Sequence, residues 1–141
     1  MQKRIILAGL VIVLIFSACR KNNSQVPNVA VDEYLNLNLP EYLPLNAVNN
    51  WIYYNYAGYK GIIVIRTAPN EFVALERSCT FDPNQSGAIV DGLQADIFGV
   101  DSLCGSKFSL IDGSVVNGPA AQPLIRYKAD LLPNNILHIY N

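Results

Sequence analysis

The sequence predicts an all-β fold, an antiparallel sandwich or barrel built from several short strands. Apolar residues recur at every second position in several short segments, a period typical of half-buried strands. Gly, Pro and Asn residues separate these segments at close spacing, as turns between short strands require. No window has the apolar pattern of a long amphipathic helix, and no internal repeat is present. Short strands joined by tight turns are typical of an all-β domain.

The first 18 residues resemble the signal peptide of a bacterial lipoprotein. Lys3 and Arg4 form a basic start, and residues 5–16 are an apolar run of about a dozen residues. Ser17-Ala18 are small residues that precede Cys19. In such signals the peptide is cut before the cysteine, whose thiol carries a diacylglycerol, so the resemblance implies lipidation of Cys19. A transmembrane anchor is the alternative, but the run is shorter than the roughly 20 residues that cross a bilayer.

A lipid at Cys19 implies that the mature protein is held on a membrane outside the cytoplasm. We therefore expect a cell-envelope location on the periplasmic or surface side, and specifically the outer membrane. Residues 19–30 are polar and irregular, which predicts a flexible, lipidated tether. Residues 31–141 are enough for one domain with a single core and too few for two ordinary ones.

The charge balance gives no reason to expect a nucleic-acid partner. The chain has 10 Lys and Arg and 11 Asp and Glu. Removal of the signal peptide takes away two basic residues, which leaves eight basic against eleven acidic residues and a formal charge of −3. Nucleic-acid-binding domains carry basic patches, and no basic stripe is present.

The expected strands follow the tether in order. In the first of them leucine alternates with asparagine until Pro40 stops the run. The later segments are short and many are rich in aromatic or β-branched residues. Asp91-Gly92 is expected to be the turn between two of them. The predicted strand segments are 35–39, 51–56, 61–66, 72–76, 88–90, 94–98, 114–116, 124–127 and 136–140.

Two stretches of the sequence resemble the cluster-binding loops of Rieske [2Fe-2S] domains. The later stretch contains Gly105-Ser106-Lys107-Phe108, then Asp112-Gly113-Ser114 and Gly118-Pro119-Ala120, in the order and spacing of the second loop. Cys79-Thr80-Phe81 resembles the first loop, less specifically. The resemblance covers about residues 31–141 and implies a Rieske-like antiparallel sandwich or barrel. It also implies that Gly105 allows close backbone approach to a cluster, that Ser106 hydrogen-bonds to its sulfur, and that Gly118 to Ala120 cover it as a lid.

The ligand positions of this resemblance are degenerate. The family supplies two Cys and two His donors, whereas Phe81 stands at the first His position, Asp101 at the second Cys position and Cys104 at the second His position. Cys79, Asp101 and Cys104 would form at most an incomplete site, because a phenylalanine cannot coordinate iron. We therefore expect no cofactor and no metal, with electron transfer through an atypical [2Fe-2S] site as the alternative.

The resemblance also implies that Cys79 and Cys104 lie close together, because both loops face one cluster in the family. We expect them to form a disulfide in an oxidising compartment, with two unpaired buried thiols as the alternative. The bridge would close a loop of about 25 residues, which the chain-entropy model values at roughly 3 kcal/mol.

The remaining candidates for chemistry are weak, so no catalytic residue is predicted. His138 is the only histidine and alternates with Leu137 and Ile139, which places it on the opposite face of a terminal strand. A hydrolase triad has no second histidine to draw on, and Cys79 and Cys104 are too far apart in sequence for a Cys-x-x-Cys redox pair.

The aromatic segment 51–56, extended by Tyr59, is a candidate binding surface. On a strand, Trp51 and Tyr53 face one side while Tyr54 and Tyr56 face the other, so some rings must be exposed. Exposed rings can hold a protein or glycan partner, and aromatic cross-strand pairing is the structural alternative. The sequence therefore predicts a non-enzymatic structural or interaction module of the cell envelope, with electron transfer and glycan or protein binding as alternatives.

Overall fold

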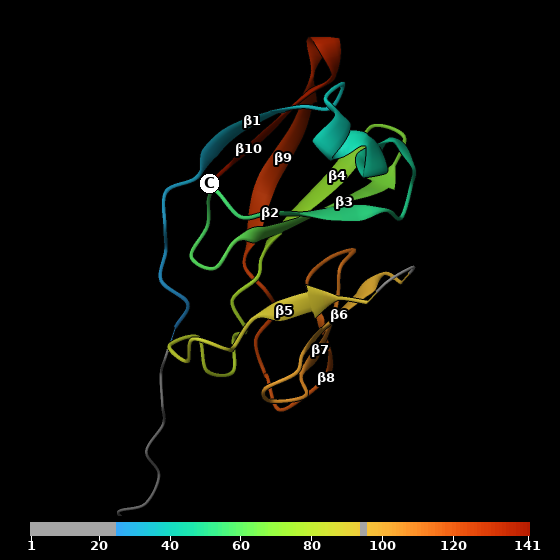
Figure 1. Cartoon of the computed structure of the whole chain (residues 1–141). Coiled ribbons are helices and arrows are strands. Elements are labelled where there is room, and N and C mark those ends of the chain that lie inside the picture. Colours follow the sequence, from blue (N-terminus) through green and yellow to red (C-terminus); the bar gives the residue numbers. More distant parts are fainter. Residues whose placement is uncertain (1–24, 94–95) are drawn as a thin grey trace, which may run out of the picture.

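The computed structural model describes residues 25–93 and 96–141 and consists of two antiparallel sheets (Figure 1). The predicted all-β fold is confirmed. The predicted signal peptide, Cys19 and the first part of the tether lie outside the described residues. Among the residues that are described, none belongs to a helix long and apolar enough to span a bilayer.

The larger sheet has six strands in the order β1-β10-β9-β4-β3-β2. Its bounds are β1 (Asp32–Asn36), β2 (Trp51–Tyr54), β3 (Ile62–Ala68), β4 (Glu71–Glu76), β9 (Arg126–Leu132) and β10 (Ile136–Tyr140). Two short 3-10 helices, η2 (Pro40–Asn46) and η3 (Pro133–Asn135), connect β1 to β2 and β9 to β10. Asn141 hydrogen-bonds to Asn28, Val29 and Val31, which fastens the chain just before β1 to the C-terminus.

The smaller sheet has four strands in the order β5-β6-β7-β8 and lies below the larger sheet in Figure 1. Its bounds are β5 (Val90–Gly92), β6 (Phe98–Asp101), β7 (Lys107–Ser109) and β8 (Val115–Asn117). The turn between β7 and β8 contains Asp112-Gly113, and Gly113 has a φ of 82° that glycine accommodates.

The apolar residues form two clusters on opposite faces of β3 and β4. Ile62 and Val64 belong to the cluster inside the curled larger sheet, together with residues of β1, β2, β9 and β10. Ile63 and Ile65 belong to the second cluster, which packs the larger sheet against residues such as Phe108 of the smaller one. Because β3 is buried on both faces, its sequence is a continuous apolar run rather than an alternating one.

Several predicted strand boundaries differ from the structure. β1 ends at Asn36, and the leucine–asparagine run after it turns instead into η2. Residues 124–127 only overlap the start of β9, and β7 was not predicted at all. Asp91-Gly92 is not a turn but lies within β5, because Asp91 pairs with Arg77 at 2.6 Å and Gly92 lies against the Trp51 ring. A Cβ at Gly92 would lie 2.6 Å from Trp51 Cζ2, so glycine is needed there for close packing.

A buried carboxylate, Glu76, connects several segments of the chain where β4 ends. Glu76 is fully buried and accepts hydrogen bonds from Tyr59 N at 2.6 Å, Lys60 N at 2.8 Å, Ser78 N at 3.0 Å and Tyr127 Oη at 2.8 Å. We call this group of five residues the Glu76 junction. It fixes the β2–β3 connection and β9 to the segment that leads into the loop carrying Cys79.

Candidate functional site

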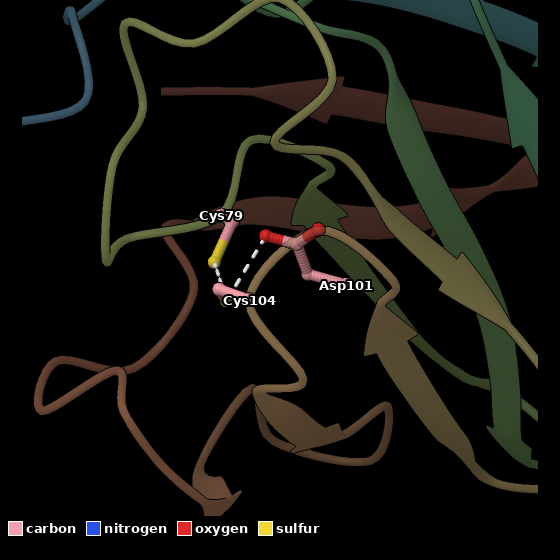
Figure 2. Close-up of side chains that lie close together, drawn as sticks. All are labelled: Cys79, Asp101 and Cys104. Atoms are coloured by element: carbon pink, nitrogen blue, oxygen red, sulfur yellow. Dashed lines mark hydrogen bonds between the residues drawn. The ribbon is translucent and has the colours of Figure 1, made fainter.

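Two loops next to the smaller sheet bring Cys79, Asp101 and Cys104 together. We call these three residues the loop apex. Cys79 lies in the connection between β4 and β5, Asp101 ends β6, and Cys104 lies in the turn between β6 and β7. One ligand atom from each residue lies within 4.8 Å of the other two. Figure 2 shows the Cys79 sulfur and the Asp101 carboxylate both directed toward Cys104. The expectation that the two cysteines lie close together is met, since their sulfur atoms are 3.7 Å apart.

Cys79 is held in an apolar environment. Its side chain is fully buried, it belongs to the second hydrophobic cluster, and its backbone N donates to Ala88 O at 3.1 Å. Burial raises the pKa of the Cys79 thiol to about 12, with further increases from Asp101 and Cys104, while a backbone hydrogen bond at Phe81 acts in the opposite direction. The raised pKa keeps the thiol protonated at neutral pH until an oxidant or a bound cation replaces its proton.

The turn between β6 and β7 places Asp101 and Cys104 by local hydrogen bonds. Asp101 is buried, and its Oδ1 accepts from Leu103 N at 2.9 Å, while its backbone oxygen accepts from Gly105 N at 2.7 Å. The Cys104 thiol lies 3.2 Å from Asp101 Oδ2 and 3.0 Å from Ser106 Oγ. Backbone hydrogen bonds from Gly105 N to Asp101 O and from Asp101 N to Ser106 O close this turn, which brings the Cys104 sulfur next to the carboxylate.

The role that the resemblance implied for Gly105, close approach to a cluster, stays a prediction. A Cβ at this residue would meet no other protein atom within 4 Å. Its φ of 78° lies in the left-handed region, which explains the glycine by backbone geometry alone. The buried hydroxyl of Ser106 contacts the Cys104 sulfur at 3.0 Å, and its implied hydrogen bond to a cluster sulfur stays a prediction.

Ala120 packs in the same apolar cluster as Cys79, and the lid role that the resemblance implied for Gly118 to Ala120 stays a prediction. Ala120 N donates to Ser106 Oγ at 2.9 Å, and Thr80 Oγ1 donates to Gln122 O at 2.6 Å. The Gly118-Pro119 peptide bond is cis. These contacts connect the third loop to both loops that carry the cysteines.

The donors of the apex do not fit a [2Fe-2S] cluster. Such a centre needs four thiolate or imidazole donors, and the part of the chain described here offers two sulfur atoms and one carboxylate at this position. Phe81 has no donor atom and is 49% exposed. His138 lies on β10 in the other sheet, where it hydrogen-bonds to Asp32 at 2.7 Å.

His138 faces away from the core, as predicted. Its neighbours Leu137 and Ile139 are fully buried, whereas its ring is stacked between Tyr34 and Tyr140 at centroid distances of 4.2 and 4.4 Å. The histidine is thus part of a surface stack of aromatic rings.

The aromatic segment divides between the core and the surface, as predicted. Ile52 and Tyr54 are buried in the apolar cluster inside the larger sheet. Trp51 is half-buried, and its Nε1 donates a hydrogen bond to Asp96 O, whereas Tyr56 is 87% exposed. Tyr53 is partly exposed and is covered by the guanidinium group of Arg77 at 3.9 Å from the ring centroid. A surface hollow of about 420 Å³ lies between the β3–β4 hairpin and β9 and includes none of these aromatic residues.

The sequence reasoning missed Glu76 and its partners. The available signal was an acidic residue directly after the four apolar residues 72–75 of β4, because a strand segment buried on both faces does not tolerate an unpaired charge. Its hydrogen-bond donors lie 2 to 51 residues away in sequence, and no local pattern identifies them.

No family model and no curated protein matches the chain. Two solved structures are similar to it in outline. One is from the complex of reduced oxygenase and oxidised ferredoxin in carbazole 1,9a-dioxygenase, with 16% identity, a TM-score of 0.49, and coverage of 81% of this chain and 94% of that chain. The other is described as an NADH-dependent nitrite reductase small subunit from Mycobacterium tuberculosis, with 14% identity, a TM-score of 0.48, and coverage of 81% and 97%. At these values neither likeness assigns a family or an activity to this chain.

Proposed function

We propose that this chain is a membrane-tethered, non-enzymatic structural or interaction module whose Rieske-like domain does not carry a [2Fe-2S] cluster. The observation that carries the proposal is the donor set at the loop apex. Two sulfur atoms and one carboxylate lie within 4.8 Å of one another, and the residue at the first His position of the Rieske resemblance is Phe81. A binuclear iron centre needs four donors.

The decisive experiment is the composition of the purified full-length protein. We expect a colourless protein without stoichiometric iron or acid-labile sulfide, and without an EPR signal on reduction. Two iron atoms and two sulfides per chain would overturn the proposal and favour its alternative, electron transfer through an atypical [2Fe-2S] site with a donor from another chain.

The tether is the second part of the proposal and is supported by the sequence. A basic start, an apolar run and small residues before Cys19 form the pattern of a lipoprotein signal. We propose a lipid anchor in the bacterial outer membrane. Cys19→Ala is expected to move the protein from the membrane fraction to the soluble fraction of the producing cell or to leave the signal uncut. An unchanged, processed and membrane-bound variant would contradict lipidation.

The fate of the two thiols at the apex depends on their surroundings. We propose that an oxidant such as a disulfide-exchange protein converts the Cys79 and Cys104 thiols into a disulfide, with the release of two protons and the transfer of two electrons to the oxidant. Their sulfur atoms are 3.7 Å apart, compared with about 2.05 Å in a disulfide bond, so a small movement suffices. The intact mass of the protein, measured before and after reduction, should increase by two hydrogen atoms when the disulfide is reduced. Free thiols in protein isolated without reductant would contradict the bridge.

The partner of such a module is expected to be a protein or a glycan of the cell envelope. Exposed aromatic rings support this expectation, above all Tyr34 at 60% and Tyr56 at 87% exposure.

A further inference from the structure

We propose that the loop apex, with its two thiols reduced, is a mononuclear site for a thiophilic divalent cation of the Zn²⁺ type, held by Cys79 Sγ, Cys104 Sγ and an oxygen of Asp101. The inference deepens the proposed function and rests on it in one respect, since a cluster and a single cation cannot share the same sulfur atoms. The disulfide proposed above uses these sulfur atoms too, so the cation and the disulfide are alternative states of the apex, and the cation binds only the reduced chain.

The distances at the apex match the edges of a tetrahedral zinc site. With Zn–S bonds of about 2.3 Å and Zn–O bonds of about 2.0 Å, a tetrahedron has S–S edges of about 3.8 Å and S–O edges of about 3.5 Å. The two sulfur atoms are 3.7 Å apart, and Cys104 Sγ lies 3.2 Å from Asp101 Oδ2. These two edges differ from the tetrahedral values by about 0.1 and 0.3 Å. The third edge, from Cys79 Sγ to Asp101, lies within 4.8 Å and closes when a cation draws the three donors together.

The charge of Asp101 lacks a strong partner. Its carboxylate accepts one backbone N–H, from Leu103. Its other neighbours at the apex are two weak S–H donors, Cys104 at 3.2 Å from Oδ2 and Cys79. The two ion pairs within residues 25–93 and 96–141 are Arg77–Asp91 and His138–Asp32, and neither involves Asp101. A buried carboxylate with so little compensation favours a cation beside it. Binding would replace the protons of two thiols, which leave to solvent, and would give the site a formal charge of −1.

The neighbouring groups hold the donors in place and leave one position open. Ser106 N lies 3.4 Å from the Cys104 sulfur as a donor, and the Ser106 hydroxyl, fixed by Ala120 N, can donate to that sulfur once its proton has left. Cys79 and Asp101 are buried, whereas Cys104 is only half-buried, so a cation has a path from solvent. A water molecule is expected in the fourth position. Two sulfur donors with one oxygen favour Zn²⁺ over Mg²⁺ or Ca²⁺, which prefer oxygen-only sites.

The test is a Co²⁺ titration of the reduced, metal-free, full-length chain in a Cys19→Ser background, which removes the third thiol. We expect one Co²⁺ per chain, with the intense visible bands of tetrahedral Co²⁺ and a thiolate-to-metal charge-transfer band, both abolished by adding Zn²⁺. Cys104→Ser should remove the charge-transfer band or halve it. Asp101→Asn should keep the two thiolates but weaken binding roughly 10-fold to 100-fold. Asp82→Asn, three residues after Cys79 and outside the apex, is the matched carboxylate control and should bind as the unmodified site does.

Each outcome decides the proposal. Absence of the bands, or equal binding by the parent protein and Cys104→Ser, would overturn it. Thermal melting of each metal-free variant shows whether that variant is folded. If the Cys104→Ser variant is not folded, the lower Co²⁺ affinity expected for Asp101→Asn still tests the site. Iron and acid-labile sulfide in the purified protein would overturn the cluster-free function as well, whereas their absence together with failed Co²⁺ binding would overturn the cation site alone.

Discussion

Glu76 and Asp101 are both buried carboxylates close to the loop that carries Cys79, yet their surroundings differ. Each oxygen of Glu76 accepts two hydrogen bonds from N–H or O–H donors, with distances from 2.6 to 3.0 Å. Asp101 Oδ1 accepts one backbone N–H, and Oδ2 faces the Cys104 thiol at 3.2 Å. The same chemical group is fully satisfied in one place and only partly satisfied in the other.

This difference separates a structural carboxylate from one that is free to bind. Four donors at Glu76 come from the β2–β3 connection, from the residue after Arg77 and from β9, so the carboxylate joins segments that are distant in sequence. The partners of Asp101 lie two and three residues away in the same turn. Loss of the Glu76 carboxylate should therefore lower the stability of the fold. Loss of the Asp101 carboxylate should instead lower the affinity for a bound cation.

Glu76→Gln should have the largest effect on stability, a loss of about 3 kcal/mol in the free energy of unfolding. Whichever oxygen the amide nitrogen replaces, it faces at least one backbone N–H that then has no acceptor. Urea denaturation followed by Trp51 fluorescence measures the change. Glu71→Gln, at the exposed start of the same strand, is the control and should be nearly neutral. Equal stability of the two variants would refute the structural role of Glu76.

Gly58→Ala should cost about 2 kcal/mol through the same junction. Gly58 has a φ of 81°, and a Cβ there would lie 2.7 Å from Glu76 Oε2. Gly87→Ala is the matched control, because the nearest atom to its Cβ is Leu103 Cδ2 at 3.9 Å. Thermal and urea unfolding should show a clearly lower free energy of unfolding for Gly58→Ala than for Gly87→Ala. The reverse order would contradict the packing around Glu76.

Tyr127→Phe should cost about 1.5 kcal/mol at neutral pH, because it removes one of two donors from Glu76 Oε2. Burial, followed by the hydrogen bond to Glu76 and its charge, raises the pKa of Tyr127 above its ordinary 10.0. Above pH 10 the Tyr127 hydroxyl loses its proton in the unfolded chain but keeps it in the folded chain, so the free energy of unfolding of the parent protein falls as pH rises. Tyr127→Phe lacks this hydroxyl and therefore lacks this contribution to the pH dependence.

The measurement is the difference in unfolding free energy between the two proteins at pH 8, 10 and 11. The gap should be constant below about pH 10 and narrow above it, while other tyrosines contribute equally to both proteins. A gap that widens with pH would show that Tyr127 is not protonated beside Glu76.

The loop apex was predictable from the sequence, and the Glu76 junction was not. Cys79, Asp101 and Cys104 were identified because two loop motifs resemble a known pattern, and the structure brings all three together. Glu76 carries no motif, and its donors Tyr59 and Tyr127 are brought to it only by the pairing of β3, β4 and β9. Long-range pairing of this kind leaves no local trace in a single sequence.

The strands show the same division. The segments that form β2, β3, β4 and β10 were predicted because their apolar or aromatic composition is strong within a few residues. The turn expected at Asp91-Gly92 was wrong, since a local turn preference was overridden by the contacts with Arg77 and Trp51. Asp91 and Gly92 instead pair with Val100 and Gly99 of β6.

Asp101→Asn should have the smallest effect on stability, a loss of less than about 1 kcal/mol in the reduced, metal-free protein. The asparagine Oδ1 can still accept from Leu103 N, and its amide nitrogen would face the Cys104 sulfur, a weak acceptor. The same acid-to-amide change is thus made at two buried carboxylates, and urea denaturation compares them directly. If Asp101→Asn is as destabilising as Glu76→Gln, then Asp101 supports the fold like Glu76 and is not reserved for a cation. A small loss, combined with weaker Co²⁺ binding, would separate binding from stability at the loop apex.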